Sequence, residues 1–290
     1  MPELPEVETV RRGLLELIIN RRVTAVECDT PKSFPNADAD VQKFLIGSKI
    51  IDVRRRAKVL LIDLSSEYTL VIHLKMTGQL VFRATHVSFG AGHPNDSLVG
   101  NLPDKSTRVT FTFADGSHLY FNDQRKFGWV RLIPTLEVPN IDFMRKVGPE
   151  PLEADFTAAQ FTERFARRAK SSIKAALLDQ TVVAGVGNIY ADESLWGAKI
   201  HPLRLVGSLT KSEFVDLYRE LRYVMNLSIE KGGSTDRNYV NAEGKKGSYI
   251  DFARAFRQEG KPCPRCGEII IKMRVAGRGT HICPQCQVIK

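Results

Sequence analysis

The last thirty residues contain the pattern that most restricts how this chain can fold, two Cys-x2-Cys pairs. Cys263 and Cys266 form the first pair, and Cys283 and Cys286 form the second after a gap of sixteen residues. Two such knuckles bring four thiolates together around one tetrahedral Zn²⁺. Because no position is left for a reacting water, the pattern predicts one structural zinc. A segment this short has little core of its own, so the metal supplies much of its stability.

The residues between the two pairs predict a β-hairpin. "IIIKMRV" and "THI" are strand-like, and the tip "AGRG" carries Arg278. The chain has 42 Lys and Arg against 33 Asp and Glu, a net charge of +9, which favours a polyanionic partner. An arginine at the tip of a zinc hairpin is therefore interpreted as a probe of DNA. The alternative is a zinc-stapled tail that holds a protein partner or caps the fold.

Length and composition exclude several classes. A chain of 290 residues suggests about two domains. No segment approaches the roughly 18 consecutive apolar residues of a membrane span, and Glu3, Glu6 and Glu8 precede any apolar run, unlike a signal peptide. Four of the five cysteines are paired at metal-binding spacing and only Cys28 stands alone, which argues against a disulfide framework. We expect a cytoplasmic protein without membrane contact.

The first half of the chain reads as a helix followed by many short strands. Apolar residues recur at helical spacing over 7–18, and strand-like runs fill 49–133, with a hairpin turn at 114–117. Short strands at this spacing predict a β-sandwich or barrel. The stretch 84–106 is rich in Gly, Pro, Asn and Ser, and it predicts a long loop between strands.

The second half reads as helical. A proline-rich linker near 134–151 is followed by a helix with Thr157 as its N-cap. A longer helix starts with Thr210 and Glu213 as a capping box and stops at Gly232-Gly233.

The stretch "VVAGVGNIYADESLWGAKIHP" predicts a tight turn that ends in a helix. Gly185 and Gly187 permit the turn, and Asn188 opens the helix, where backbone N–H groups can receive a phosphate. Lys170 and Lys174 strengthen such a clamp, or they are solvated surface charges. A single Gly-x-Gly is weak support, because glycines more often serve turn geometry.

The N-terminus "MPELPEVETVRRGL" carries an unusual candidate nucleophile. Removal of Met1 leaves Pro2 as a secondary amine, whose pKa lies far below that of lysine. Much of that amine is therefore available as an uncharged nucleophile near neutral pH.

Three separated stretches, the N-terminal motif, "GVGNIYADESLW…IHP" and the paired cysteines, together resemble formamidopyrimidine-DNA glycosylase over the whole length. The resemblance implies an α+β multidomain fold: an N-terminal helix plus β-sandwich, a helix–two-turns–helix domain and a zinc-finger β-hairpin, with DNA between the two lobes. The implied parts are a catalytic domain over 1–133, a linker over 134–150, a DNA-binding domain over 151–233, a lesion-covering loop over 234–258 and a zinc finger over 259–290.

The resemblance also implies the chemistry of a bifunctional DNA glycosylase and abasic-site lyase for oxidised purines in double-stranded DNA. Pro2 attacks the sugar C1′, and the resulting iminium allows β- and δ-elimination. Glu3 is the general acid/base, and Glu6 shapes the site. Lys58 contacts the lesion and its phosphate, and Arg278 grips phosphates and assists δ-elimination. Without the resemblance, the two glutamates would be read as complementing the helix dipole, and Lys58 as an exposed lysine at a strand start.

Four further residues match DNA contacts of that family, and a fifth lies beside such a position. Met76, Arg125 and Phe127 match the side chains that fill the gap left by an everted nucleotide. Asn188 matches a phosphate-binding asparagine, and Lys170 neighbours the position of a phosphate-contacting lysine. Taken alone, Met76 and Phe127 would more often be core residues.

Several positions depart from the family pattern. Ser106 stands where a histidine is frequent, and His93 is no safe substitute for it. Lys126 replaces an arginine, and Ala169 stands where the phosphate-contacting lysine is expected. The covering loop keeps Thr235 and Tyr249.

Two rival functions remain open at this stage. An endonuclease VIII-like enzyme for oxidised pyrimidines shares the proline and the zinc finger, but the N-terminal motif and the Met76, Arg125 and Phe127 set argue against it. A catalytically silent zinc-containing DNA-binding protein requires a retained methionine or a broken nucleophile. We expect a monomer that associates with the nucleoid of a bacterium and needs no redox cofactor.

Overall fold

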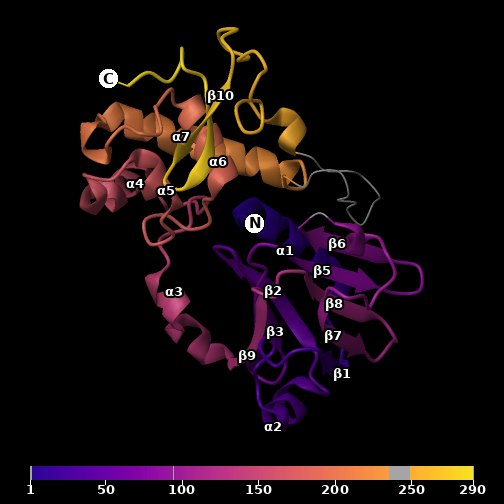
Figure 1. Cartoon of the computed structure of the whole chain (residues 1–290). Coiled ribbons are helices and arrows are strands. Elements are labelled where there is room, and N and C mark those ends of the chain that lie inside the picture. The colour runs from indigo at the N-terminus through magenta and orange to yellow at the C-terminus, as the bar shows by residue number, and fades with distance from the viewer. Residues whose placement is uncertain (1, 94, 235–248, 290) are drawn as a thin grey trace. The chain divides into compact units, whose positions relative to one another are not determined.

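The computed structural model describes residues 2–93, 95–234 and 249–289 (Figure 1). The chain divides into two compact units. One unit comprises Met1–Arg145 and Lys231–Ser248, and the other comprises Lys146–Glu230 and Tyr249–Lys290. Among the described residues, no helix combines the length and the apolar character needed to cross a bilayer.

The first unit contains two antiparallel sheets and an N-terminal helix, α1 (Leu4–Ile18). The five-stranded sheet has the order β1 (Val23–Cys28), β7 (Thr107–Phe113), β8 (His118–Asp123), β5 (Gly78–Arg83) and β6 (Ser88–Gly92). The four-stranded sheet has the order β2 (Ile50–Arg56), β3 (Val59–Leu64), β4 (Tyr68–His73) and β9 (Trp129–Pro134). Two short helical turns, α2 (Asp38–Asp40) and the π-type η1 (Val41–Leu45), precede β2.

One apolar core joins α1 to both sheets, which makes the unit the predicted sandwich. The buried face of α1 contributes Val7, Val10, Leu14 and Ile18, as the helical spacing predicts. Every second residue of β3, starting at Leu60, points into the same core. The predicted turn at 114–117 joins β7 to β8.

Two stretches that were predicted to be irregular carry structure. The prediction of a loop over all of 84–106 was wrong, because β6 (Ser88–Gly92) pairs with β5 and η2 (Asp96–Leu98) follows it. The proline-rich stretch after β9 contains η3 (Thr135–Asn140) and α3 (Asp142–Lys146). Val138 of η3 packs with Val59 and Leu61 on the outer face of the four-stranded sheet, so this stretch covers apolar surface that would otherwise face water.

The second unit is helical and ends in a hairpin. Its helices are α4 (Ala158–Phe165), α5 (Ile173–Leu178), α6 (Asn188–Gly197) and α7 (Lys211–Glu230), with short turns η4 (Ala166–Arg168), η5 (Val206–Ser208) and η6 (Tyr249–Phe252). The hairpin pairs β10 (Ile271–Val275) with β11 (Arg278–Ile282), as the sequence predicts. Helix α6 is buried along most of its length, between α5, α7 and β11.

The helix ends follow the predicted capping chemistry. Thr157 caps α4 in a box with Gln160. The Thr210 hydroxyl accepts from the Glu213 amide at 3.2 Å, and the Thr210 amide donates to the Glu213 carboxylate at 2.8 Å, which closes the predicted box at the start of α7. Gly232 and Gly233 follow α7 with positive φ angles, which terminates the helix.

Candidate functional site

The candidate nucleophile lies directly before α1. Pro2 is buried, and the next residue, Glu3, is the N-cap of the helix and only 3 % exposed. The Glu3 amide donates to Glu6 Oε2 at 2.8 Å. Glu6 Oε1 accepts from the amide of Ser234 at 2.9 Å, so Glu6 joins the start of α1 to the end of the described segment that follows α7. The N-terminal residues are therefore held by the fold rather than left as a free tail.

Lys58 is buried at the turn between β2 and β3, only 5 % exposed, which contradicts its reading as an exposed lysine. The strand position after it, Val59, pairs with His73 at the end of β4. Burial, with the nearby positive charges of Lys75 and Lys58, lowers the pKa of His73 to about 3. The imidazole is thus neutral at physiological pH, and its Nδ1 accepts from the Lys75 amide at 3.0 Å. The positive charges of Lys58 and Lys75 near the end of β4 suit an anion such as a phosphate.

Sequence reasoning missed His73. The signal that could have found it is the "HLKMTG" stretch, in which the histidine ends a strand two residues before a lysine. Its proximity to Lys58 depends on strand pairing, which the stretch alone does not reveal.

Two turns carry the residues predicted to fill a gap in DNA. Met76 is half-buried in the turn between β4 and β5. Arg125 and Phe127 are exposed on the turn between β8 and β9, and the Arg125 guanidinium lies 5.0 Å from the centroid of the Phe127 ring. Phe127 is 47 % exposed, so the reading of this phenylalanine as a core residue is wrong.

The second unit brings Asn188 to the zinc hairpin. Asn188 opens α6, as predicted, and its Nδ2 donates to the carbonyl of Gly279 at 2.9 Å. Its Oδ1 is buried and accepts no hydrogen bond from any residue that the structure describes. Arg278 is exposed next to Gly279, at the start of β11. Lys170 is also exposed, in the short stretch between η4 and α5.

Lys174 is neither part of a phosphate clamp nor a solvated surface charge, and both readings of it were wrong. Its side chain is fully buried, and its Nζ donates to Asp192 Oδ1 at 2.5 Å and to the Thr280 hydroxyl at 2.7 Å. Asp192 Oδ2 in turn accepts from the His281 amide at 2.9 Å. A buried charge is tolerated only when it is paired in this way, so Lys174 fixes β11 against α5 and α6.

The positions that depart from the family pattern are oriented as follows. Ser106 is buried and donates to Asp104 Oδ1 from both its amide and its hydroxyl, at 2.7 Å each, so it faces the protein. His93 is half-buried beyond β6, and burial lowers its pKa. Lys126 is exposed, and so is Ala169.

Most of the expected covering loop lies outside the described residues, including Thr235. Within the part of the expected loop that the structure describes, Tyr249 is buried in η6 and donates to Glu193 Oε2 at 3.1 Å. Burial and the negative charge of Glu193 raise the pKa of Tyr249, so the hydroxyl stays protonated.

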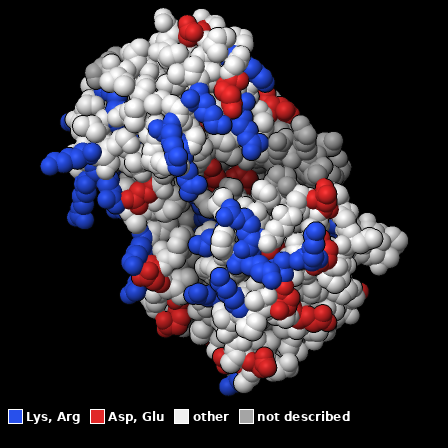
Figure 2. Space-filling view, viewed as in Figure 1, with Lys and Arg blue, Asp and Glu red and all other residues white. Residues whose placement is uncertain are grey.

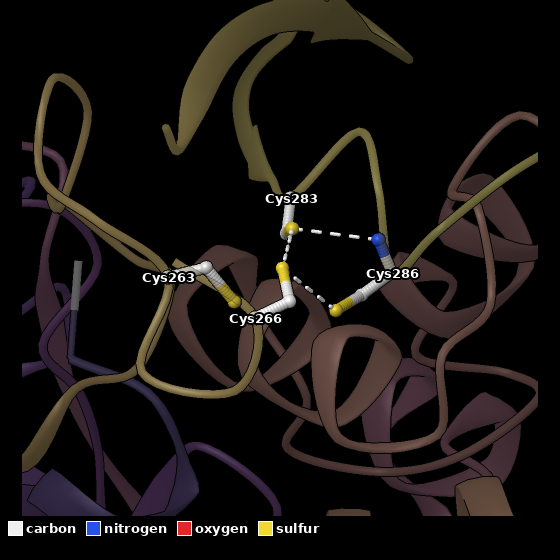
Figure 3. Close-up of side chains that lie close together, drawn as sticks. All are labelled: Cys263, Cys266, Cys283 and Cys286. Atoms are coloured by element: carbon white, nitrogen blue, oxygen red, sulfur yellow. Dashed lines mark hydrogen bonds between the residues drawn. The ribbon is translucent and has the colours of Figure 1, made fainter. Parts of the chain in front are cut away.

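The four paired cysteines converge as a metal site requires (Figure 3). Their sulfur atoms all lie within 4.8 Å of one another, and Cys266 Sγ is 3.4 Å from Cys283 Sγ and 3.5 Å from Cys286 Sγ. Sulfur atoms bound to one Zn²⁺ at about 2.3 Å have separations of this order.

The ionisation of the cysteines also fits a cation. Burial acts to raise the pKa of Cys263, but backbone N–H groups of Arg265 and Cys266 stabilise the thiolate and bring the pKa to about 6. Burial and the neighbouring sulfur atoms raise the pKa of Cys283 to about 12. Four thiolates therefore share this space only if a cation neutralises them, and the cluster holds one structural zinc.

The zinc cluster is continuous with the helices of its unit. Cys263, Cys283 and Ile270 pack with Trp196 of α6 in one apolar cluster. The guanidinium of Arg265 lies 3.9 Å from the centroid of the Trp196 ring, and it donates to the Trp196 carbonyl at 3.0 Å. The metal site is thus anchored to the same helix that carries Asn188.

The surface charge agrees with a polyanionic ligand. On the face that Figure 2 presents, Lys and Arg side chains gather in patches on each unit, with fewer acidic side chains between them.

Comparison with known proteins gives three family matches that together span most of the chain. Residues 1–130 match the formamidopyrimidine-DNA glycosylase N-terminal domain, residues 147–239 match the formamidopyrimidine-DNA glycosylase H2TH domain, and residues 260–288 match the zinc finger found in FPG and IleRS.

Individual relatives match over the full length. The chain is 42% identical to a formamidopyrimidine-DNA glycosylase of Pelotomaculum thermopropionicum, with 100% of each chain covered. It is similar to Lactococcus lactis Fpg in complex with an abasic site containing DNA, with a TM-score of 0.86, 36% identity, and 98% and 99% of the two chains covered. It is also similar to MutM in complex with carbocyclic 8-oxo-G containing DNA, with a TM-score of 0.85, 36% identity and 99% of each chain covered.

Proposed function

Because the chain belongs to the formamidopyrimidine-DNA glycosylase family, we propose that it uses Pro2 to excise 8-oxoguanine and formamidopyrimidines from duplex DNA and then cleaves the abasic strand. The family consists of bifunctional DNA glycosylases and abasic-site lyases, and the chain is such an enzyme. The substrates named for its relatives, 8-oxo-G and abasic-site DNA, support both halves of the proposal.

The observation that carries the proposal is the position of Pro2. It is buried and lies directly before Glu3, the buried N-cap residue of α1. The secondary amine attacks C1′ of the damaged nucleoside and forms a C–N bond while the glycosidic bond breaks. The proton that the departing base requires comes from Glu3, which follows Pro2 directly. The nitrogen then loses its proton and the C1′–O4′ bond breaks as O4′ takes up a proton, which opens the sugar ring. The product is an open-chain iminium, whose positive nitrogen withdraws electrons from C2′.

Strand cleavage follows from that iminium. Loss of a C2′ proton to a base pushes electrons toward C3′ and expels the 3′ phosphate, and a second elimination expels the 5′ phosphate. Lys58 and Arg278 bind these phosphates and neutralise the charge that develops on them. The buried ammonium of Lys58 beside a neutral His73 supports this role.

Recognition of the lesion requires a nucleotide to leave the stack. Met76, Arg125 and Phe127 fill the gap that it leaves, and an exposed phenylalanine under an arginine is suited to insertion between bases. Asn188 and Lys170 contact the DNA backbone. The docking of Asn188 on the zinc hairpin supports a shared phosphate site with Arg278.

We also propose a division of the chain into five functional parts. The parts are a catalytic domain over 1–133, a linker over 134–150, a DNA-binding domain over 151–233, a covering loop over 234–258 and a zinc finger over 259–290. We further propose that the enzyme acts as a monomer at the nucleoid in the bacterial cytoplasm.

The test is borohydride trapping on a duplex with one 8-oxoguanine opposite cytosine, followed by peptide mass spectrometry. The proposal expects a DNA adduct on Pro2 with Met1 absent. A matched protein with a blocked N-terminus should bind the duplex without forming an adduct. Binding without an adduct by the unblocked enzyme refutes the lyase assignment for this substrate, and preference for thymine glycol over 8-oxoguanine refutes the oxidised-purine assignment.

A further inference from the structure

A single buried carboxylate, Asp123 at the end of β8, binds donors from two different turns. Asp123 is only 1 % exposed. Its Oδ1 accepts from the Thr77 hydroxyl and from the Arg125 amide, the latter at 3.2 Å. Its Oδ2 accepts from the amides of Phe127 at 2.8 Å and Gly128 at 2.6 Å. Hydrogen bonds to a carboxylate are stronger than hydrogen bonds between two neutral groups.

The two turns that meet at Asp123 are both crossings between the sheets. Residues 74–77 lead from β4 in the four-stranded sheet to β5 in the five-stranded sheet. Residues 124–128 lead from β8 back to β9 in the four-stranded sheet. The first turn carries Met76 beside Thr77, and two of the donors on the second turn belong to Arg125 and Phe127 themselves.

Asp123 is itself held in place by the sheet. Its amide donates to the Ser106 carbonyl at 2.8 Å, and its carbonyl accepts from Arg108 Nε at 2.8 Å. The close approach of Gly128 also depends on the lack of a side chain. A Cβ there would lie 2.7 Å from the Phe121 ring and 3.1 Å from Asp123 Oδ2. The backbone of Asp123 is therefore held by neighbouring strands of the sheet, and both turns donate hydrogen bonds to its carboxylate.

We propose that Asp123 is a positioning residue for nucleotide eversion, which holds Met76, Arg125 and Phe127 as one preformed wedge through the two turns. The inference rests on the proposed role of those three residues in filling the gap. A wedge that is ordered before DNA binds loses less conformational entropy on insertion than one ordered by the DNA. Asp123 touches neither DNA nor the reacting atoms in this scheme and acts through its neighbours.

The first test is the variant Asp123→Asn. Asparagine has one acceptor oxygen, and its NH₂ group would face amide donors in place of the second oxygen. We expect the eversion rate, measured by stopped-flow fluorescence of 2-aminopurine beside an 8-oxoguanine, to fall about 10- to 100-fold, the range for a misplaced positioning group. The rate of base release at saturation should fall with it, while the KM for the duplex changes by less than about threefold, because phosphate contacts dominate affinity.

A milder pair of variants keeps the inference testable if Asp123→Asn fails to fold. Thr77→Val removes only the hydroxyl that ties the Met76 turn to Asp123, and Thr77→Ser restores a hydroxyl. We expect slower eversion in the valine variant and recovery in the serine variant. Equal eversion rates for both would overturn the link between the turns.

The matched control is Asp63→Asn in the four-stranded sheet. Asp63 is also buried, at 7 % exposed, and it accepts hydrogen bonds from Arg54 and the Thr69 hydroxyl, neither of which belongs to either turn. If this variant slows eversion as much as Asp123→Asn at similar thermal stability, the effect is a general loss of stability and the inference fails.

A double-variant cycle separates this inference from the proposed function. If Phe127→Ala leaves eversion unchanged, the wedge assignment is wrong. If Phe127→Ala slows eversion while Asp123→Asn does not, only the inference is wrong. If both slow it, and Asp123→Asn has little further effect in the Phe127→Ala background, then Asp123 acts through the wedge.

Discussion

The buried Lys174–Asp192 pair allows a quantitative test of how the zinc hairpin is held to its helices. The variant Lys174→Met removes the ammonium but keeps similar length and leaves Asp192 buried without its main partner. Breaking a buried ion pair from one side costs about 3–5 kcal/mol, because the remaining charge stays uncompensated. The Thr280 hydroxyl also loses a donor at 2.7 Å. We therefore expect about 3–5 kcal/mol lower stability of this unit, and a melting temperature at least roughly 10 °C lower.

The assay is urea unfolding followed by tryptophan fluorescence. The chain has two tryptophans, Trp129 in the first unit and Trp196 in the second. In a Trp129→Phe background, Trp196 reports the second unit alone, which keeps its transition separate from that of the first.

A double variant tests the same ion pair by removing both charges. Lys174→Met combined with Asp192→Leu removes both charges, and the pair should regain most of the lost stability, since apolar replacement of a buried ion pair is often neutral. A loss below about 1 kcal/mol in the single variant is the size typical of an exposed pair and would refute the burial argument.

Three further predictions concern pH, metal and salt. Burial acts to raise the pKa of Glu8, but hydrogen bonds from Arg11 and Arg12 lower it to about 2, below its usual 4.5. The stabilisation from Glu8 is therefore present above about pH 4.5 and is lost as the pH falls toward 2, so acid unfolding curves of Glu8→Gln should be flatter than wild type across that window; parallel curves would contradict this. Removal of zinc by a chelator should lower DNA affinity and quench or shift the Trp196 fluorescence together, because the cluster packs on that ring; an unchanged Trp196 signal in the metal-free protein would contradict the coupling. Arg278→Ala should weaken binding of undamaged DNA and reduce the slope of log K against log salt by about 1, as expected for one lost phosphate contact; an unchanged slope would mean that Arg278 does not bind a phosphate.

The elements that were predicted correctly are those with local signals. The spacing of Val7, Val10 and Leu14 identifies α1, and the side chains of Thr157 and Thr210 mark helix starts within three residues of their partners. The zinc hairpin follows from cysteine spacing. In each case the information lies within one continuous short stretch of the sequence.

The features that were missed depend on partners far away in the sequence. The Gly-rich "SFGAG" of β6 has low strand propensity, and it is a strand because β5 supplies the pairing and Gly92 lies where a Cβ would be 2.5 Å from the Gly78 carbonyl. Lys174 reads as a surface lysine until Asp192 and Thr280 are brought to it from another helix and from the hairpin. The convergence of two turns on Asp123 likewise requires the sheet order.

The zinc hairpin is attached to its helices through β11 as well as through the cluster of cysteines. The carbonyl of Gly279 accepts from Asn188, and the neighbouring Thr280 accepts from Lys174, so the strand that begins with Arg278 is aligned by side chains from α5 and α6. An excised peptide of residues 259–290 would keep its four metal ligands but lose that alignment. In this chain the orientation of Arg278 therefore depends on α5 and α6 as well as on the metal. Transplanted without those helices, the finger would carry the arginine but not the side chains that orient it.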